Sequence, residues 1–186
     1  MATITIALPD WVQPFLVVRP AHYADDQARI GLALDLASEN IAQATGGPFG
    51  AAVFAQADGR LLGVGVNLVT GSQCSIAHAE MVALAGTQQA LGHHDLSTAV
   101  PGGVVLASSA EPCAMCLGAL PWAGIAHLLC GACDADVRAI GFDEGDKPAD
   151  WPARLAGRGI RVTRDLGREH ACQILADYAA GGGILY

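Results

Sequence analysis

The chain has 186 residues, of which 52% are apolar and 15% are charged, and its formal net charge at pH 7 is −8. This length and apolar content predict one globular domain with a short extension and exclude an intrinsically disordered chain. Lys147 is the only lysine, and the arginines are scattered along the sequence. A protein that tracks a phosphate backbone needs a basic stripe, so we expect small-molecule partners rather than nucleic acid.

Two segments bear on a membrane or secretory role. The first eleven residues lack a positively charged region followed by an apolar core, so we expect no signal peptide. Residues 112–133 carry no charged side chain and are long enough for a membrane span. Pro121 and three glycines interrupt this segment, and a buried helix followed by a buried strand fits it better. We therefore expect a cytoplasmic protein that makes no membrane contact.

Apolar periodicity and turn residues predict the elements in chain order. Residues 1–24 show no clear period and are predicted to form an N-terminal extension that packs on the domain of residues 25–186. Helices are predicted within this domain over residues 26–44, 77–91 and 166–179, with another that has Pro112 in its first turn. Strands are predicted over residues 51–57, 60–69, 103–108, 125–131 and 159–163, with a polar loop over 70–75.

The order of these elements indicates the fold class. Asp58-Gly59 lies between two short apolar runs and predicts an opening β-hairpin, after which strands alternate with helices. Such alternation favours a three-layer α/β/α sandwich with a mixed five-stranded sheet.

A set of metal-ligating residue types stands out in the middle of the chain. Cys113 and Cys116 are three residues apart, so they share one face if they open a helix. The partial positive charge at the amino end of a helix favours thiolates there. Together with the imidazole of His78, two thiolates would give a tetrahedral Zn²⁺ three protein ligands and leave its fourth position open to water. An open position is typical of a catalytic site rather than a structural one.

Glu80, two residues after His78, is the candidate proton carrier. A carboxylate beside an activated water can take its proton and pass it to a substrate. In a regular helix, however, positions i and i+2 point roughly 200° apart. His78 and Glu80 can therefore face one site only if one of them lies in the irregular first turn of the predicted helix.

These residues carry a resemblance. His78-Ala79-Glu80 followed by Pro112-Cys113-Ala114-Met115-Cys116 resembles the signature of the zinc-dependent nucleobase deaminases of the cytidine and deoxycytidylate deaminase superfamily. The resemblance covers about residues 26–146. Gly141-Phe142-Asp143-Glu144 and the aromatic carboxy terminus look like the bacterial guanine deaminases in particular. The resemblance implies a cytidine deaminase-like fold, a Zn²⁺ cofactor and hydrolytic deamination of a free aminopurine, with guanine giving xanthine and ammonia.

The resemblance also implies roles for individual residues. The implied metal ligands are His78, Cys113 and Cys116, and the implied catalytic residues are Glu80 and Glu144. Glu144, or its neighbour Asp143, would hold the amino group that is lost, and we favour Glu144. Substrate contacts are implied for Asn67, Phe49, Ala79 and Glu144. The bacterial guanine deaminases are homodimers, so a homodimer is expected, with Tyr186 helping to close its own or a neighbouring site.

Several alternatives stay open at this point. Cytosine, adenine or an aminotriazine could be deaminated by the same zinc chemistry. A pyrimidine deaminase of riboflavin synthesis would need a ribose phosphate site, and no basic cluster is evident. Cys130 and Cys133 could instead join Cys113 and Cys116 in a non-enzymatic four-cysteine zinc module. The apolar stretch of residues 117–129 between these pairs does not look like a zinc ribbon.

Overall fold

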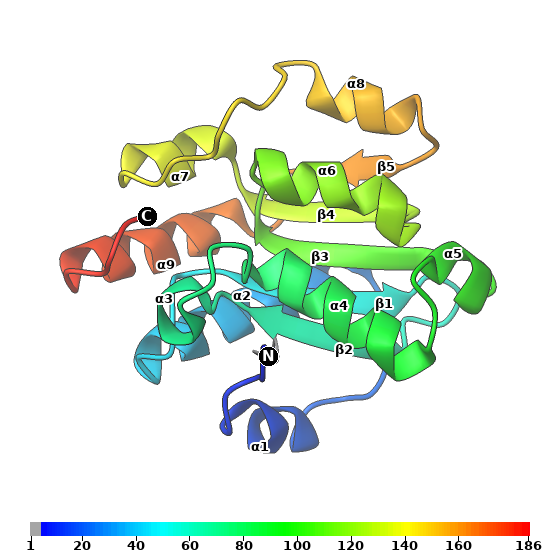
Figure 1. The fold of residues 1–186 in the computed structure, drawn as a ribbon, viewed down its shortest axis with the longest axis horizontal. Coiled ribbons are helices and arrows are strands. Elements are labelled where there is room, and N and C mark those ends of the chain that lie inside the picture. Colours follow the sequence, from blue (N-terminus) through cyan, green and yellow to red (C-terminus); the bar gives the residue numbers. More distant parts are fainter. Residues whose placement is uncertain (1–4) are drawn as a thin grey trace, which may run out of the picture.

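The computed structural model describes residues 5–186 and shows a five-stranded sheet between layers of helices (Figure 1). The strands lie in the order β2-β1-β3-β4-β5. Strand β1 is antiparallel to β2 and β3, whereas β3, β4 and β5 are parallel. The strand bounds are Gly50–Ala55 (β1), Leu61–Val66 (β2), Val104–Ala110 (β3), His127–Ala132 (β4) and Arg161–Thr163 (β5). The predicted mixed five-stranded sheet is confirmed.

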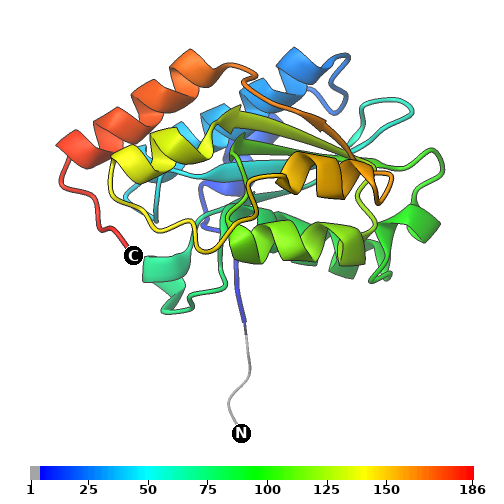
Figure 2. The same ribbon diagram turned by 90° about the horizontal axis from the view of Figure 1, so that it is seen from above.

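Helices cover both faces of this sheet (Figure 2). One face carries α2 (Asp26–Ala42) and α9 (Arg168–Ala180), and the other carries α4 (Ala79–Leu91) and α6 (Ala114–Ala123). Successive side chains of a strand point to opposite faces, so Phe54 packs in the apolar cluster below α2 while Val53 packs in the cluster below α4. The predicted α/β/α sandwich is confirmed.

Five short helices were not predicted from the sequence. They are α1 (Val12–Val17), α3 (Val69–Ser72), α5 (Leu96–Ala99), α7 (Asp134–Ala139) and α8 (Trp151–Ala156). None is longer than six residues, which is too short to show an apolar period. Helix α3 corrects part of the loop expected over residues 70–75, because the backbone N–H and the hydroxyl of Ser72 both donate to the carbonyl oxygen of Leu68.

Some element bounds also differ from the predicted ones. The first strand ends at Ala55 rather than two residues later, because residues 56–58 form the hairpin turn. Pro112 lies before α6 rather than in its first turn, since the residue that caps this helix, Cys113, has an extended backbone.

The segment of residues 5–24 lies against the rest of the chain. Val12 of α1 is 2% exposed and packs in the same cluster as α2. Near the end of the segment, Leu61 N–H donates to Ala21 O (2.9 Å) and Tyr23 N–H donates to Gly59 O (2.8 Å). These bonds attach the segment to the hairpin at the β2 edge of the sheet. The first four residues of the predicted extension lie outside the described residues, and its separation from a domain of residues 25–186 stays a prediction.

The topology brings several loops to one end of the sheet. Strand β1 begins at this end, and the antiparallel strand β2 and the strand β3 end there. The amino ends of α4 and α6 follow these strands in the chain and lie at the same end (Figure 1). Within residues 5–186, no helix is both long and apolar enough to cross a membrane.

Candidate active site

Three metal-ligating side chains meet between the amino ends of α4 and α6. His78 is the residue that precedes α4, Cys113 precedes α6, and Cys116 lies in the first turn of α6. One donor atom from each of these side chains lies within 4.8 Å of the others. Within residues 5–186, this is the one group of three or more His, Cys, Asp or Glu side chains close enough to hold a metal ion.

The backbone at His78 meets the geometric requirement on Glu80. His78 has φ −69° and ψ 155°, which is extended rather than helical, and Glu80 lies in the first turn of α4. Both side chains therefore line the same pocket. Gly65 of β2 allows α4 to lie this close to the sheet, because a Cβ at Gly65 would be 2.2 Å from the carbonyl oxygen of Ala79.

The donor set fits a tetrahedral zinc ion. Cys113 Sγ and His78 Nδ1 are 3.5 Å apart. Tetrahedral Zn–S and Zn–N bonds of about 2.3 and 2.0–2.1 Å place a sulfur and a nitrogen roughly 3.5 Å apart. The hydrogen bond from Cys116, assisted by His78 and opposed by burial, lowers the pKa of the Cys113 thiol to about 4. In this pair the Cys116 thiol is the donor, and the bond to Cys113 and burial both raise its pKa.

Two of the three ligands, His78 and Cys113, line a small pocket of about 30 Å³. Its lining residues come from loops and from the ends of helices and strands: Phe49, Asn67, His78, Glu80, Ala110, Glu111, Cys113, Phe142, Asp143, Glu144 and Tyr186. Phe142 contacts Phe49 edge to face at 5.0 Å and Tyr186 at 5.2 Å between ring centroids. These three rings form an aromatic wall. Phe142 was not predicted as a site residue from the sequence, although it directly precedes Asp143 and Glu144.

Three buried carboxyl groups line this pocket, those of Glu80, Glu111 and Glu144, and the pKa values of Glu80 and Glu144 are raised. Burial raises the pKa of Glu80, and the nearby Cys113 thiolate adds to this effect. Burial and then the same thiolate raise the pKa of Glu144 to about 8. Oε2 of Glu144 is buried and accepts no hydrogen bond from the described residues. The side chain of Asp143 is 83% exposed and lies 3.7 Å from Arg138, so Glu144 rather than Asp143 is buried in the pocket.

Asn67 lines the pocket with its side chain, whereas Ala79 does not. Asn67 is 1% exposed, and its Oδ1 accepts hydrogen bonds from Val69 N–H (3.2 Å) and from the Tyr186 hydroxyl. Tyr186 thus lies in the site of its own chain. Ala79 does not line the pocket, because its side chain is buried in the apolar cluster between α4 and the sheet. Only the backbone of Ala79 is left for the predicted substrate contact.

A network of ion pairs that was not predicted from the sequence centres on buried Glu111, two residues before Cys113. Glu111 is 3% exposed, and its carboxylate accepts from Arg164 Nε (2.5 Å) and lies 3.6 Å from Lys147 Nζ. Lys147 also donates to the carbonyl oxygen of Pro112 (3.1 Å), which ties the loop after Glu144 to the turn before Cys113. The one signal in the sequence was that Lys147 is the only lysine.

The second cysteine pair does not belong to the metal-ligand group. Cys130 is fully buried in β4, and Cys133 is the residue that precedes α7. Neither joins His78, Cys113 and Cys116 in the cluster formed within residues 5–186. The geometry therefore gives no support to the four-cysteine zinc module.

Residues 24–132 match the model of the cytidine and deoxycytidylate deaminase zinc-binding region. The chain belongs to this family. It is a zinc-dependent deaminase, as the sequence predicts. The match includes His78, Glu80, Cys113 and Cys116 and ends with strand β4.

Individual relatives agree with this assignment. The guanine deaminase of Bacillus subtilis is 37% identical over 124 residues, which are 63% of this chain and 75% of that protein. A structure of the guanine deaminase from Nitrosomonas europaea is 46% identical, with a TM-score of 0.88, and the match covers 96% of this chain and 97% of that one. A structure in complex with 2,6-diaminopurine is 47% identical, with a TM-score of 0.89 and coverage of 98% and 95%.

Proposed function

We propose that this zinc-dependent deaminase acts on a free aminopurine and converts guanine to xanthine and ammonia. One observation carries the proposal: the amide of Asn67 and the buried carboxyl groups of Glu80 and Glu144 line the same pocket as His78 and Cys113. Two similar proteins are named guanine deaminases, and a similar structure contains 2,6-diaminopurine, which supports the same substrate class.

In this proposal His78, Cys113 and Cys116 hold the zinc ion and Glu80 moves the proton. When bound, zinc would supply a Lewis acid that makes a water nucleophilic near neutral pH and favours negative charge on oxygen. The Glu80 carboxylate takes a proton from the attacking water and delivers it to the ring nitrogen next to the carbon that carries the amine. It then moves the remaining proton of that oxygen to the amine, so that the C–N bond breaks, ammonia leaves and the new carbonyl of xanthine forms. Burial raises the pKa of Glu80, so that it can hold this proton between the two steps.

The other pocket residues bind and orient the base. The side-chain amide of Asn67 offers a donor and an acceptor to one edge of the base, and the backbone at Ala79 offers a further contact. Oε2 of Glu144 is an unpartnered buried acceptor among the described residues, suited to the amino group that leaves as ammonia. Phe49 contributes an aromatic surface against which a planar base can pack.

The lining of the pocket favours a free base over a nucleotide. No lysine or arginine is among the residues described as lining it. A phosphorylated ribose would call for such a cation. Phe142 and Tyr186 also line this pocket, whose volume of about 30 Å³ leaves little space for a sugar.

The test is ammonia release from guanine, adenine, cytosine, guanosine and an aminotriazine, with zinc measured on the same sample. We expect about one zinc per chain and a kcat/KM for guanine at least tenfold above that for any other compound. A higher kcat/KM for cytosine or adenine would show that this base, rather than guanine, is the substrate. Zinc-loaded protein that is inactive on the whole panel would overturn the proposal.

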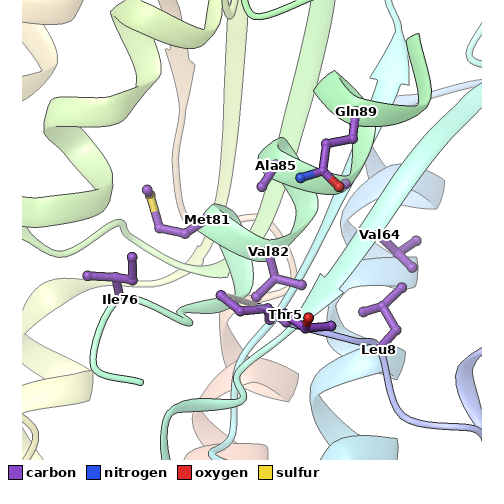
Figure 3. A pocket seen from close by; sticks show the side chains of 10 residues that line it. Thr5, Leu8, Val64, Ile76, Met81, Val82, Ala85 and Gln89 are labelled. Carbon is purple, nitrogen blue, oxygen red and sulfur yellow. The ribbon is translucent and has the colours of Figure 1, made fainter. Parts of the chain in front are cut away.

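We also propose that the protein is a homodimer in which a second copy covers the outer faces of α4 and α6. Trp122 of α6 is 82% exposed and Ile76, just before α4, is 52% exposed. A cavity of about 310 Å³ lies along α4, and its lining includes Met81 and Val82 of that helix and Thr5 and Leu8 of the N-terminal segment, whose side chains Figure 3 shows. An apolar surface of this kind is typical of an interface.

The test of the dimer is the mass of the protein in solution, measured by analytical ultracentrifugation. We expect twice the mass of the chain for the wild type and the mass of one chain for Met81→Glu. A monomeric wild-type protein would exclude the dimer.

A cytoplasmic location completes the proposal. All six cysteines are free, and two of them are proposed zinc ligands that must stay reduced. Oxidation of Cys113 and Cys116 would remove both sulfur donors. Cell fractionation of the tagged protein should place it with cytoplasmic markers, and recovery with periplasmic or membrane markers would contradict this location.

A further inference from the structure

A chain of hydrogen bonds runs from Trp11, the residue that precedes α1, to the backbone of Asn67. Asn40, near the end of α2, is fully buried, and its Nδ2 donates to the carbonyl oxygens of Gly47 (2.8 Å) and Asn67 (2.9 Å). Its Oδ1 accepts from the Thr45 hydroxyl (2.6 Å). The hydroxyl oxygen of Thr45 in turn accepts from Trp11 Nε1 (3.0 Å). The chain therefore joins the N-terminal segment to a proposed base-binding residue.

The chemistry at both ends fixes the direction of these bonds. Backbone carbonyls can only accept, so the amide of Asn40 must turn its nitrogen toward Gly47 and Asn67. The indole N–H of Trp11 can only donate, so the Thr45 hydroxyl oxygen accepts from it. The single hydrogen of this hydroxyl is then donated to Asn40 Oδ1. The carbonyl oxygen of Asn40 also lies within reach of this hydroxyl, but at 3.4 Å it is the more distant acceptor. With Thr45 and Trp11 in place, the side chain of Asn40 has one orientation.

The segments that Asn40 joins are in close contact at the pocket. A Cβ at Gly46 would lie 1.8 Å from the carbonyl oxygen of Asn67, so the loop after α2 approaches the end of β2 directly. Asn67 N–H donates to the carbonyl oxygen of Phe49 (3.0 Å) on the same loop. A rotation of the Asn40 amide would release both Gly47 and Asn67 and allow Asn67 and Phe49 to move apart.

We propose that Asn40 is a positioning residue for Asn67, and that Trp11 and Thr45 hold Asn40 in the orientation that this needs. The proposal rests on the proposed function, because it takes Asn67 as a contact of the base. Under this proposal the segment of residues 5–24, whose role the sequence left open, takes part in substrate recognition without touching the substrate. Trp11 of this segment acts on the position of the Asn67 amide through the side chains of Thr45 and Asn40.

The test compares Thr45→Val and Trp11→Phe with wild type in steady-state kinetics on guanine. Each substitution removes one hydrogen-bonding group and keeps most of the side-chain volume. We expect KM to rise about two- to tenfold in Thr45→Val, the effect of about one net hydrogen bond, with a smaller change in kcat and no change in zinc content. Thr45→Ser keeps the hydroxyl and should restore the wild-type KM.

A matched control separates positioning from general destabilisation. Thr87→Val removes a buried hydroxyl that bonds within α4, to Ala83 O. This variant should leave KM unchanged. Because Trp11 acts through Thr45, the double variant should have the KM of Thr45→Val alone rather than the product of two effects. An unchanged KM in Thr45→Val, or multiplicative effects of the two substitutions, would overturn the proposal.

Hydrogen exchange gives a readout that does not need activity. The amide of Asn67 is protected by its bond to Phe49, and Thr45→Val should raise its exchange rate about two- to tenfold while Thr87→Val leaves it unchanged. If wild type does not deaminate guanine but Asn67 exchanges faster in Thr45→Val, the proposed function fails and the structural link stands. If wild type is active and neither exchange nor KM changes, the positioning role fails alone.

Discussion

The hydroxyl of Tyr186, the last residue of the chain, donates a hydrogen bond to Oδ1 of Asn67, which lies 119 positions earlier. Tyr178 holds this tail in place, because its hydroxyl donates to the carbonyl oxygen of Ile184 (2.8 Å). In this arrangement the tail occupies Oδ1 of Asn67, the acceptor that we propose for a donor group of the base. A substrate that donates to this atom must therefore displace the Tyr186 hydroxyl.

Tyr186→Phe should lower KM for guanine by about two- to tenfold, because the competing hydroxyl is lost while the ring still packs on Phe142. Steady-state kinetics measure this change. Tyr23→Phe is the matched control, since its hydroxyl is buried without a partner among the described residues, close to the hairpin. A higher KM in Tyr186→Phe would show that the hydroxyl helps to hold the base.

Glu80→Gln should lower kcat by about 100- to 10,000-fold, the range for loss of a general acid–base group. The amide has nearly the shape of the carboxyl group, so zinc content and folding should not change. Rapid mixing with guanine and metal analysis on the same sample measure both quantities. Deamination near the wild-type rate would exclude Glu80 as the proton carrier.

Cys113→Ser should reduce the zinc content to well below one per chain, whereas Cys130→Ser should keep it at the wild-type level. Only Cys113 lies in the cluster with His78 and Cys116, and Cys130 is buried in β4. Metal analysis after gel filtration measures the difference. Equal zinc loss in the two variants would favour the four-cysteine module instead.

Folding stability should fall as the pH drops from about 6.5 to about 4, in part through His127. Burial and the nearby Arg161 guanidinium lower the pKa of this imidazole from 6.5 to about 4. His127 accepts from Arg161 Nη2 (2.8 Å) and bonds to Thr163 Oγ1 (2.9 Å) in its neutral form. The unfolded chain binds the proton first as the pH falls, so the free energy of unfolding decreases across this interval.

Urea unfolding at several pH values measures this dependence. His127→Gln should flatten the slope between pH 6.5 and 4, and the exposed His22 provides a matched control in His22→Gln. The control should keep the wild-type slope. Identical slopes in all three proteins would show that His127 does not carry the effect.

Much of the fold followed from local patterns. The sequence predicts a helix that begins at Asp25 or Asp26, because Asp is a common capping residue and apolar residues repeat along one face. In the structure the Asp25 side chain accepts from Ala28 N–H (2.8 Å) and caps this helix. Helices α1 and α8 were missed because six residues do not complete two turns, and such helices depend on tertiary packing. Their buried residues, Val12 and Trp151, pack against parts of the chain distant in sequence.

The sequence alone determined the kind of chemistry, because His, Cys and Glu at these spacings leave few alternatives to a catalytic zinc. The tertiary structure decided which acidic neighbour is buried, Glu144 rather than Asp143, and which pocket receives Tyr186. It also decided that Asn40 bonds to Asn67. These outcomes depend on distances between residues far apart in the chain, and only packing of the helices on the sheet sets those distances.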